Sequence, residues 1–180
     1  YCKWLIELPE DDLMSGYWEH VRGADMLYSV QWLYQRTGEA SLLPLIDRIH
    51  RHTARWMDGV ANGHGVNFAQ GFREPAEFSL RTGKKEHLQA SYSDLEKIRT
   101  EYGQVPGGLF GADENVRPGY TDARQAAETC TMVEMMWSDQ RLLAISGDPF
   151  WADHCEEIAF NNLPAALTPD HKALHYLTAP

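Results

Sequence analysis

The stretches "LYQRTGEASLL" (33–43) and "EFSLRTGKKEHL" (77–88) decide the fold, because the second repeats the plan of the first. Each contains the end of a helical pattern, then Arg-Thr-Gly, then a polar step into another helical pattern. Gly38 and Gly83 are 45 residues apart, and a glycine in this position favours a left-handed helix cap. A helical hairpin that recurs at such a period predicts stacked helix pairs.

Hydrophobic spacing supports this interpretation along most of the chain. Apolar residues three and four positions apart predict helices, here at about 17–37, 42–57, 66–81 and 85–102. A looser copy of the turn, "LLAISGDPFWADHCEEIAF" (142–160), is centred on Gly147. No strand-like alternation of any length is present. The chain is therefore expected to be all-α, as an open solenoid or a closed α/α toroid.

Length and charge exclude some classes of protein. A chain of 180 residues is one domain or a piece of a larger one. Its 16 basic and 26 acidic residues disfavour a nucleic-acid or anionic-membrane partner, since both need clustered Lys and Arg. The chain has no apolar run of transmembrane length. Three widely spaced cysteines predict reduced thiols, at Cys2, Cys130 and Cys155.

The segment 103–121, "GQVPGGLFGADENVRPGYT", differs from the helical regions around it. Its five glycines and two prolines exclude a helix. It also carries the polar residues Asp113, Glu114 and Arg117. Long irregular segments in compact helical folds are often functional, so this one is a candidate site loop.

The next candidate is the pair Glu128 and Cys130 in "AAETCTMVEMM" (126–136). On a helix, positions i and i+2 point about 200° apart, whereas on extended backbone they share a side. A capping box formed by Thr131 and Glu134 would leave both residues extended. A helix that starts at Asp122 would separate them. Residue types alone leave both starts open.

Five tryptophans offer flat surfaces on which a sugar ring can stack. At helical spacing such residues are more often core, and we expect at least three of them to be buried. The five are Trp18, Trp32, Trp56, Trp137 and Trp151.

Two longer stretches resemble a known family, namely "YGQVPGGLFGADENVRPGYTDARQAAETC" (102–130) and "SGDPFWADHCEEIAFNNLPAALTPDHKALHYLTAP" (146–180). They are similar to the β-L-arabinofuranosidase-like glycoside hydrolases, family 127 and its relatives. "WLYQRTG" (32–38) and "GHGVNFAQGF" (63–72) fit the same pattern. The resemblance implies a catalytic domain folded as an (α/α)6 toroid, and residues 1–180 would form part of that domain.

The resemblance also implies a set of site residues and an activity. Glu114 matches the general acid/base of the family. Glu128 and Cys130 match two ligands of a Zn²⁺ ion. Tyr176 matches an active-site tyrosine, and His64 resembles a sugar-contacting histidine. The implied activity is retaining hydrolysis of β-L-arabinofuranosides or related plant-glycan sugars.

Some family features differ or lie elsewhere. Asp25 in "GAD" stands where many members have a sugar-binding histidine, and Glu114 lies closer to Glu128 than in characterised members. Two further cysteine ligands, one of them the nucleophile, are expected beyond Pro180, so we expect the chain to be inactive alone. The alternatives are a non-catalytic carbohydrate-binding or scaffold toroid and an α/α-toroid lyase or epimerase, which would have no need of Cys130.

The chemistry explains why such residues would be used together. A glycosidase needs an acid for the leaving oxygen and a nucleophile or base opposite it. A thiol of pKa about 8.5 is mostly protonated at neutral pH, and zinc coordination deprotonates it. Glu114 has to be protonated first, so burial or a neighbouring charge should raise its pKa.

Overall fold

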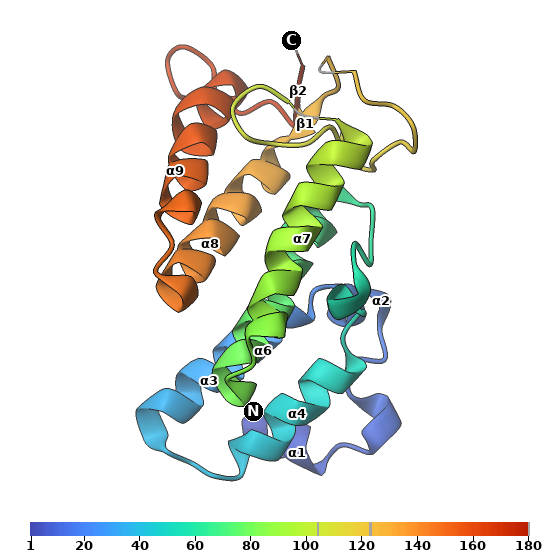
Figure 1. The fold of residues 1–180 in the computed structure, drawn as a ribbon, viewed down its shortest axis with the longest axis vertical. Coiled ribbons are helices and arrows are strands. Elements are labelled where there is room, and N and C mark those ends of the chain that lie inside the picture. Colours follow the sequence, from blue (N-terminus) through green and yellow to red (C-terminus); the bar gives the residue numbers. More distant parts are fainter. Residues whose placement is uncertain (104, 123, 180) are drawn as a thin grey trace.

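The computed structural model describes residues 1–103, 105–122 and 124–179, and these form helices joined by short turns (Figure 1). The helices are α1 (Cys2–Glu7), α2 (Tyr17–Val21), α3 (Gly23–Thr37), α4 (Leu42–His52), α5 (Gly65–Gly71), α6 (Glu74–Thr82), α7 (Lys85–Tyr102), α8 (Thr129–Ser146) and α9 (Pro149–Glu157). Short 3₁₀ turns cover Glu10–Asp12, Trp56–Asp58 and Leu163–Ala166, and a π turn covers Ile158–Asn162. Two strands, β1 (Ala127–Glu128) and β2 (Leu177–Thr178), pair antiparallel. The predicted all-α class is confirmed.

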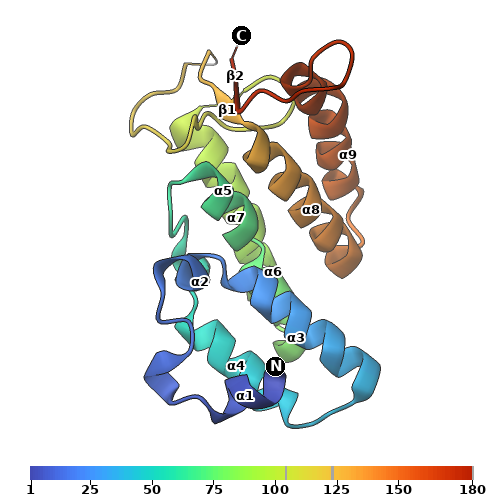
Figure 2. The same cartoon turned by 180° about the vertical axis from the view of Figure 1, so that it is seen from behind.

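Three pairs of consecutive helices pack together, α3 with α4, α6 with α7 and α8 with α9. Left-handed glycines end the first helix of each pair, with φ of 66° at Gly38 and 69° at both Gly83 and Gly147. Each glycine amide donates to the carbonyl four residues earlier, at 2.7–2.8 Å. The three turns predicted from the sequence are therefore present. Seen from behind (Figure 2), α5 and α8 lie side by side and bring the pairs together.

The helix predicted over 17–37 is two helices, α2 and α3, with a break at Arg22. Within one helix the carbonyl of His20 would accept from the amide four residues later. Here it accepts instead from the Ala54 amide at 2.8 Å and the Thr53 hydroxyl at 3.0 Å. A side chain at Gly23 would collide with Thr53. Tertiary contacts thus replace local helix bonds at this point.

Two other boundaries differ for local reasons. The helix predicted over 66–81 is interrupted between α5 and α6, because Pro75 has no amide to donate to Gly71. The helix predicted over 42–57 ends at His52, because Thr53 is extended, with φ −79° and ψ 161°. The fourth predicted helix, 85–102, coincides with α7. Across the described residues no helix combines the length and apolar character that crossing a bilayer requires.

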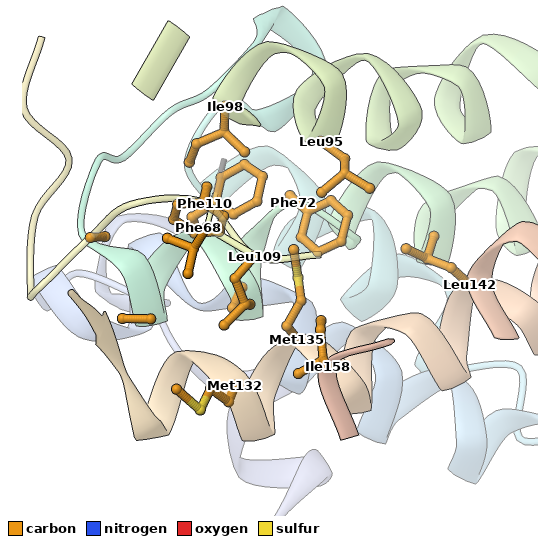
Figure 3. Close-up of a cluster of buried hydrophobic side chains, with 14 of the residues drawn as sticks. Phe68, Phe72, Leu95, Ile98, Leu109, Phe110, Met132, Met135, Leu142 and Ile158 are labelled. Atoms are coloured by element: carbon orange, nitrogen blue, oxygen red, sulfur yellow. The ribbon is translucent and has the colours of Figure 1, made fainter. Parts of the chain in front are cut away.

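Two apolar clusters hold the helices together. The smaller one joins α1, α3 and α4 and includes Phe78 of α6. The larger one joins α5 to α9 and is drawn in Figure 3, where Phe68 of α5 and Phe72, just after that helix, lie on one side of the cluster and Met132 and Met135 of α8 on the other. Each fully buried side chain of this size contributes about 1.5–3 kcal/mol relative to an exposed one.

The tryptophans are less buried than the sequence suggested. Trp56 and Trp151 are fully buried, Trp137 is partly buried against Tyr28, and Trp18 and Trp32 are exposed. The expectation of at least three core tryptophans is therefore wrong. Trp18 lies in the five-residue helix α2, which is too short to bury a full face.

The segment 103–121 is free of helix wherever it is described, and a buried histidine anchors its first half. His154 of α9 contacts the Asp139 carboxylate of α8 through Nδ1 and the Gly108 carbonyl through Nε2, both at 2.8 Å. The Gly108 carbonyl and an ionised Asp139 carboxylate can only accept, so a ring that carries two protons satisfies both contacts, although burial also raises the pKa of Asp139. Burial alone would lower the pKa of His154, but the bonds to Asp139 and Gly108 outweigh it and raise the pKa. One charged side chain thus joins the loop to α8 and α9.

This anchor makes stability depend on pH. The unfolded pKa of histidine is about 6.5, and the folded pKa of His154 is higher. The contribution of His154 to the free energy of unfolding is therefore complete below about pH 6.5 and is lost as pH rises through the folded pKa. We expect His154→Gln to destabilise the protein most at low pH, with a shrinking difference from wild type at higher pH.

Urea denaturation at a series of pH values measures this difference, and His171→Asn at an exposed histidine is the control. A destabilisation by His154→Gln that stayed the same at every pH would show that the ring is neutral in the folded state.

Candidate functional site

Two short strands join the start of α8 to the end of the described chain. Glu128 in β1 lies opposite Leu177 in β2. Thr129 strengthens the junction, because its amide donates to the Tyr176 carbonyl at 3.0 Å and its hydroxyl to the His175 carbonyl at 2.6 Å. Tyr176 is therefore fixed beside Glu128, although the two are far apart in the sequence.

This junction also sets the start of α8, and both starts predicted from the sequence are wrong. The helix begins at Thr129 with Glu128 as its N-cap, rather than at Thr131 or Asp122. The hydroxyl of Thr131 is buried and has no hydrogen-bond partner among the described residues, so it caps nothing. Glu128 stays extended, with φ −79° and ψ 136°, while Cys130 lies in the first turn of the helix.

With this backbone the side chains of Glu128 and Cys130 meet. Glu128 is buried and Cys130 is exposed. Partial desolvation, together with a hydrogen bond to the Glu128 carboxylate, raises the pKa of the Cys130 thiol. In the absence of a cation, the thiol is therefore held in its protonated form.

Tyr176 connects this pair to the glycine-rich loop. Its hydroxyl donates to Glu114 Oε1 at 3.2 Å and also faces Glu128. The Glu128 carboxylate first, and then Glu114, raise the pKa of Tyr176 to about 12. The phenol stays protonated and bridges two carboxylates that come from separate segments of the chain.

Backbone bonds, rather than side chains, hold the part of the loop that carries Glu114. The Glu114 carbonyl accepts from the Gly65 amide at 2.8 Å, and the Val116 amide donates to the Gly63 carbonyl at 2.8 Å. Between them, His64 pairs with Asn115. Glu114 is exposed, so the burial that we expected around it is absent. The nearest acid across the site is Glu128, which interacts with the same Tyr176 hydroxyl as Glu114 does.

His64 lies next to this loop segment. Its Nδ1 atom is buried and has no hydrogen-bond partner among the described residues. The neighbouring carboxylate Asp113 is already engaged, because it pairs with Arg117 and accepts from the Glu114 amide at 3.0 Å. Of the two adjacent acids, Glu114 is the one that faces Tyr176.

Asp25 lies in a separate group of polar residues. Its carboxylate pairs with Arg73, whose side chain is fully buried and also donates to Ser138 Oγ at 2.7 Å. In the part of the chain that the structure describes, no hydrogen bond or ion pair joins Asp25 to Glu114. It interacts instead with Glu134 of α8. Burial, followed by the charge of Asp25, raises the pKa of Glu134.

The donor atoms at the start of α8 match part of what a zinc site requires. Zinc accepts thiolate and carboxylate ligands, and Glu128 and Cys130 present one of each. One oxygen of Glu128, Oε2, is buried without a hydrogen-bond partner among the described residues. Within the same residues, no three His, Cys, Asp or Glu side chains converge. The pair fits half of a four-coordinate site, to be completed by other donors.

Two residues of this region were not recognised from the sequence. Thr129 positions Tyr176, and the sequence pattern around Glu134 indicates only a capping box. A signal for Glu134 was present, because it lies four residues after Cys130 and therefore on the same face of α8. Nothing local could have identified Thr129, since its partners lie in β2.

A family model for the β-L-arabinofuranosidase GH127 catalytic domain matches residues 1–180. No curated protein matches the chain.

Several solved structures share its fold. A GH127 β-arabinofuranosidase is 18% identical with a TM-score of 0.64 over 83% of this chain and 26% of its own. A GH127 β-L-arabinofuranosidase from Geobacillus stearothermophilus T6 is 16% identical, with a TM-score of 0.66 over 85% of this chain and 30% of its own. A sugar epimerase from a ruminal bacterium is 16% identical, with a TM-score of 0.65 over 88% of this chain and 46% of its own.

The chain thus spans less than half the length of these structures, and at such identities they show a shared fold. The family model covers the whole sequence. This chain belongs to the GH127 β-L-arabinofuranosidase catalytic-domain family.

Proposed function

We propose that this chain is part of a zinc-dependent, retaining glycoside hydrolase that acts on β-L-arabinofuranosides or related plant-glycan sugars. The observation that carries the proposal is the meeting of Glu114, Tyr176, Glu128 and Cys130, which come from three separate segments. We further propose that the helix pairs form part of an (α/α)6 toroid. The family membership supports both proposals.

Glu114 is assigned the general acid and base. It is exposed to an incoming substrate, and the Tyr176 hydroxyl orients one of its oxygens at 3.2 Å. In the first half-reaction its proton goes to the leaving sugar oxygen, while a cysteine thiolate outside this chain forms a bond to the anomeric carbon. In the second, the Glu114 carboxylate takes a proton from water, whose oxygen displaces that thiolate.

Glu128 and Cys130 are assigned the zinc ligands of this chain, with two further cysteines expected outside it. When bound, zinc supplies a positive charge that favours thiolates over thiols. The carboxylate of Glu128 holds the Cys130 thiol in place for this role. Tyr176 keeps its proton beside both carboxylates and so links the acid/base to the ligand pair.

The two rival functions make different demands on these residues. A non-catalytic carbohydrate-binding or scaffold toroid needs neither an acid at Glu114 nor a thiol at Cys130. A lyase or epimerase uses tyrosine and histidine groups and has no use for the Glu128–Cys130 contact. The contact between an acid and a thiol therefore favours the hydrolase.

Cys130→Ser tests the ligand assignment. We expect the full-length protein to lose zinc, because a serine hydroxyl is a far weaker ligand than a thiolate. Cys155→Ser is the matched control, since Cys155 is a free thiol in α9 whose Sγ contacts the Met136 carbonyl at 3.7 Å. Elemental analysis after dialysis reads the metal content. Stoichiometric zinc at wild-type affinity in Cys130→Ser would refute the assignment.

Glu114→Gln tests the acid/base role, because it removes the proton while nearly preserving shape. General acid catalysis contributes about 10²–10⁴-fold. A loss of this size is expected for a disaccharide, whose alkoxide leaving group needs the proton. A nitrophenyl glycoside, whose leaving group hardly needs one, should show a rapid burst of nitrophenol and then slow turnover. Azide, which needs no base, should accelerate that turnover.

Two controls accompany this variant. Glu96→Gln, at an exposed acid of α7, should behave as wild type. Cys130→Ser should lose activity on the disaccharide and on the nitrophenyl glycoside to the same extent. If Glu114→Gln lost activity equally on both substrates, with no burst and no azide rescue, Glu114 would not be the acid/base.

A further inference from the structure

A buried carboxylate without a counter-ion lies in α7, apart from the candidate active site. Asp94 is only 1% exposed. Its Oδ2 atom is shielded from solvent and has no hydrogen-bond partner among the described residues. A buried polar atom without a partner is costly, and a buried unpaired charge is more so. A cation that reached Asp94 would therefore be strongly favoured.

A route from solvent to this carboxylate exists, because Asp94 lines a cavity of about 490 Å³ between α7 and the turn at 57–59. In this space, the Asp94 cavity, Met57 and Ala90 supply apolar walls, and the exposed Ser93 lies at the rim. Gly59 closes the turn with a φ of 123°, a conformation that favours glycine. The Asp94 cavity thus has a charged group on its wall and apolar atoms beside it.

The charges around the Asp94 cavity leave one negative charge unbalanced. The other three charged side chains that the described residues contribute to its walls each have a partner of opposite charge, at N–O distances of 2.5–3.9 Å. These pairs are Asp58–Arg55, Glu86–Lys84 and Lys97–Glu101. Asp94 is the exception, so a ligand with a single positive charge complements the cavity.

The geometry also selects the kind of cation. A metal ion does not suit the cavity, because within the described residues no three His, Cys, Asp or Glu side chains converge. A guanidinium pairs best with both oxygens of a carboxylate, whereas Oδ2 of Asp94 is shielded and only Oδ1 is left for a ligand. An ammonium is a compact charge that one oxygen can hold. An alkyl chain attached to it would cover Met57 and Ala90.

We propose that the Asp94 cavity binds a primary alkylammonium group, with its nitrogen on Asp94 and its chain against Met57 and Ala90. The Ser93 hydroxyl and the Gln89 amide oxygen, both on the same wall, can accept from the remaining N–H groups. The group belongs either to a free aliphatic amine or to a lysine side chain of a polypeptide. The proposal is independent of the glycosidase function, because its test measures binding alone.

Binding at this site should depend on pH, because a proton and an ammonium compete for the same carboxylate. Burial raises the pKa of Asp94 to about 7, although the charge of Lys97 opposes the rise. The other charged groups that line the cavity are Asp58 from the turn and Glu86 from α7, and α6 contributes none. Since only the carboxylate form holds a cation, affinity should be constant above about pH 7. Below that pH it should fall by up to about tenfold per pH unit.

The test titrates propylamine into the full-length protein, and ligand-observed NMR measures the affinity at a series of pH values. Propan-1-ol, which has the same shape without the charge, is the matched neutral ligand. At pH 8 we expect propanol to bind at least about 10-fold more weakly than propylamine, as for the loss of a hydrogen bond to a charged group. Ethylamine should bind up to about four-fold more weakly than propylamine, as for one buried CH₂ group.

Three variants identify the residue responsible. Asp94→Asn keeps the shape and removes the charge, so it should weaken propylamine binding at pH 8 at least about 10-fold and abolish its pH dependence. Glu96→Gln, at an exposed acid of α7, should bind as wild type. Lys97→Met removes a repelling cation and should bind more tightly. Asp94→Asn should also unfold at a higher temperature than wild type at pH 8, because it lacks an unpaired buried charge, so its loss of binding is not a loss of folding.

A blocked tripeptide with a central lysine distinguishes the two sources of the ammonium group. Tighter binding of the tripeptide than of propylamine would identify a polypeptide lysine, and weaker or equal binding would identify a free amine. Equal affinity of wild type and Asp94→Asn for propylamine would overturn the site, as would failure of the wild-type protein to bind either ligand. Binding by Lys97→Met alone would overturn it too, because Lys97 would then be the counter-ion of Asp94.

Discussion

The pairing of Glu128 with Leu177 is the constraint on which the rest of the site depends. It keeps Glu128 extended at the N-cap position of α8. If Glu128 instead continued the helix, its side chain would point about 200° away from Cys130, and the acid–thiol contact would be lost. The same pairing places Tyr176 where its hydroxyl reaches Glu114. A sheet of two residues per strand thus brings three segments of the chain together.

So small a sheet is not stable on its own, because isolated two-stranded pairings are marginal in water. Thr129 supplies two further bonds across the junction, from its amide and its hydroxyl. The neighbouring Ala127 is buried in the larger apolar cluster, so the strand is anchored on its protein side. Helix packing therefore stabilises the sheet, and the sheet in turn positions the reactive groups.

The helix pairs could be predicted from the sequence because their causes are local. Gly38, Gly83 and Gly147 each end a helix through their own backbone conformation. The break at Arg22 could not be predicted, because the carbonyl of His20 is captured by residues more than 30 positions away. The break before Pro75 has a local cause as well, the missing amide, and so lies within reach of the sequence.

The site, like the fold, has parts that the sequence could predict and parts that it could not. Residue types and the family resemblance singled out Glu114, Glu128, Cys130 and Tyr176, and the structure places these four together. Their contacts were beyond the reach of sequence spacing, because β2 sets the start of α8. The resemblance also implies a binding role for Asp25, whose carboxylate pairs with Arg73 and interacts with the charge of Glu134. That grouping depends on Arg73, a fully buried cation that no local pattern marks as buried.

Two buried charged side chains hold together the elements that carry the site. Arg73 and His154 are both buried, and each bonds to two different segments, Arg73 to α3 and α8 and His154 to α8 and the loop. Removing one partner of a buried charged pair is strongly destabilising, because the other charge is left without compensation. Such charges can hold a unique geometry, since a shifted helix would leave them unpaired. In this chain they fix the relative positions of the elements that carry the reactive side chains.

The reactive side chains themselves are mostly at the surface, and this separates function from stability. Glu114, Cys130 and Tyr176 are exposed, while the bonds that position them are backbone bonds of Glu114, Val116 and Thr129 or buried contacts such as His154 with Gly108. A change at the carboxyl group of Glu114 therefore leaves the loop bonds intact, whereas a change at Gly108 would displace the loop without touching any reacting group. Because the positioning is done by backbone and buried charge, the exposed side chains are free to meet a substrate. Their substitution therefore reports on chemistry rather than on folding.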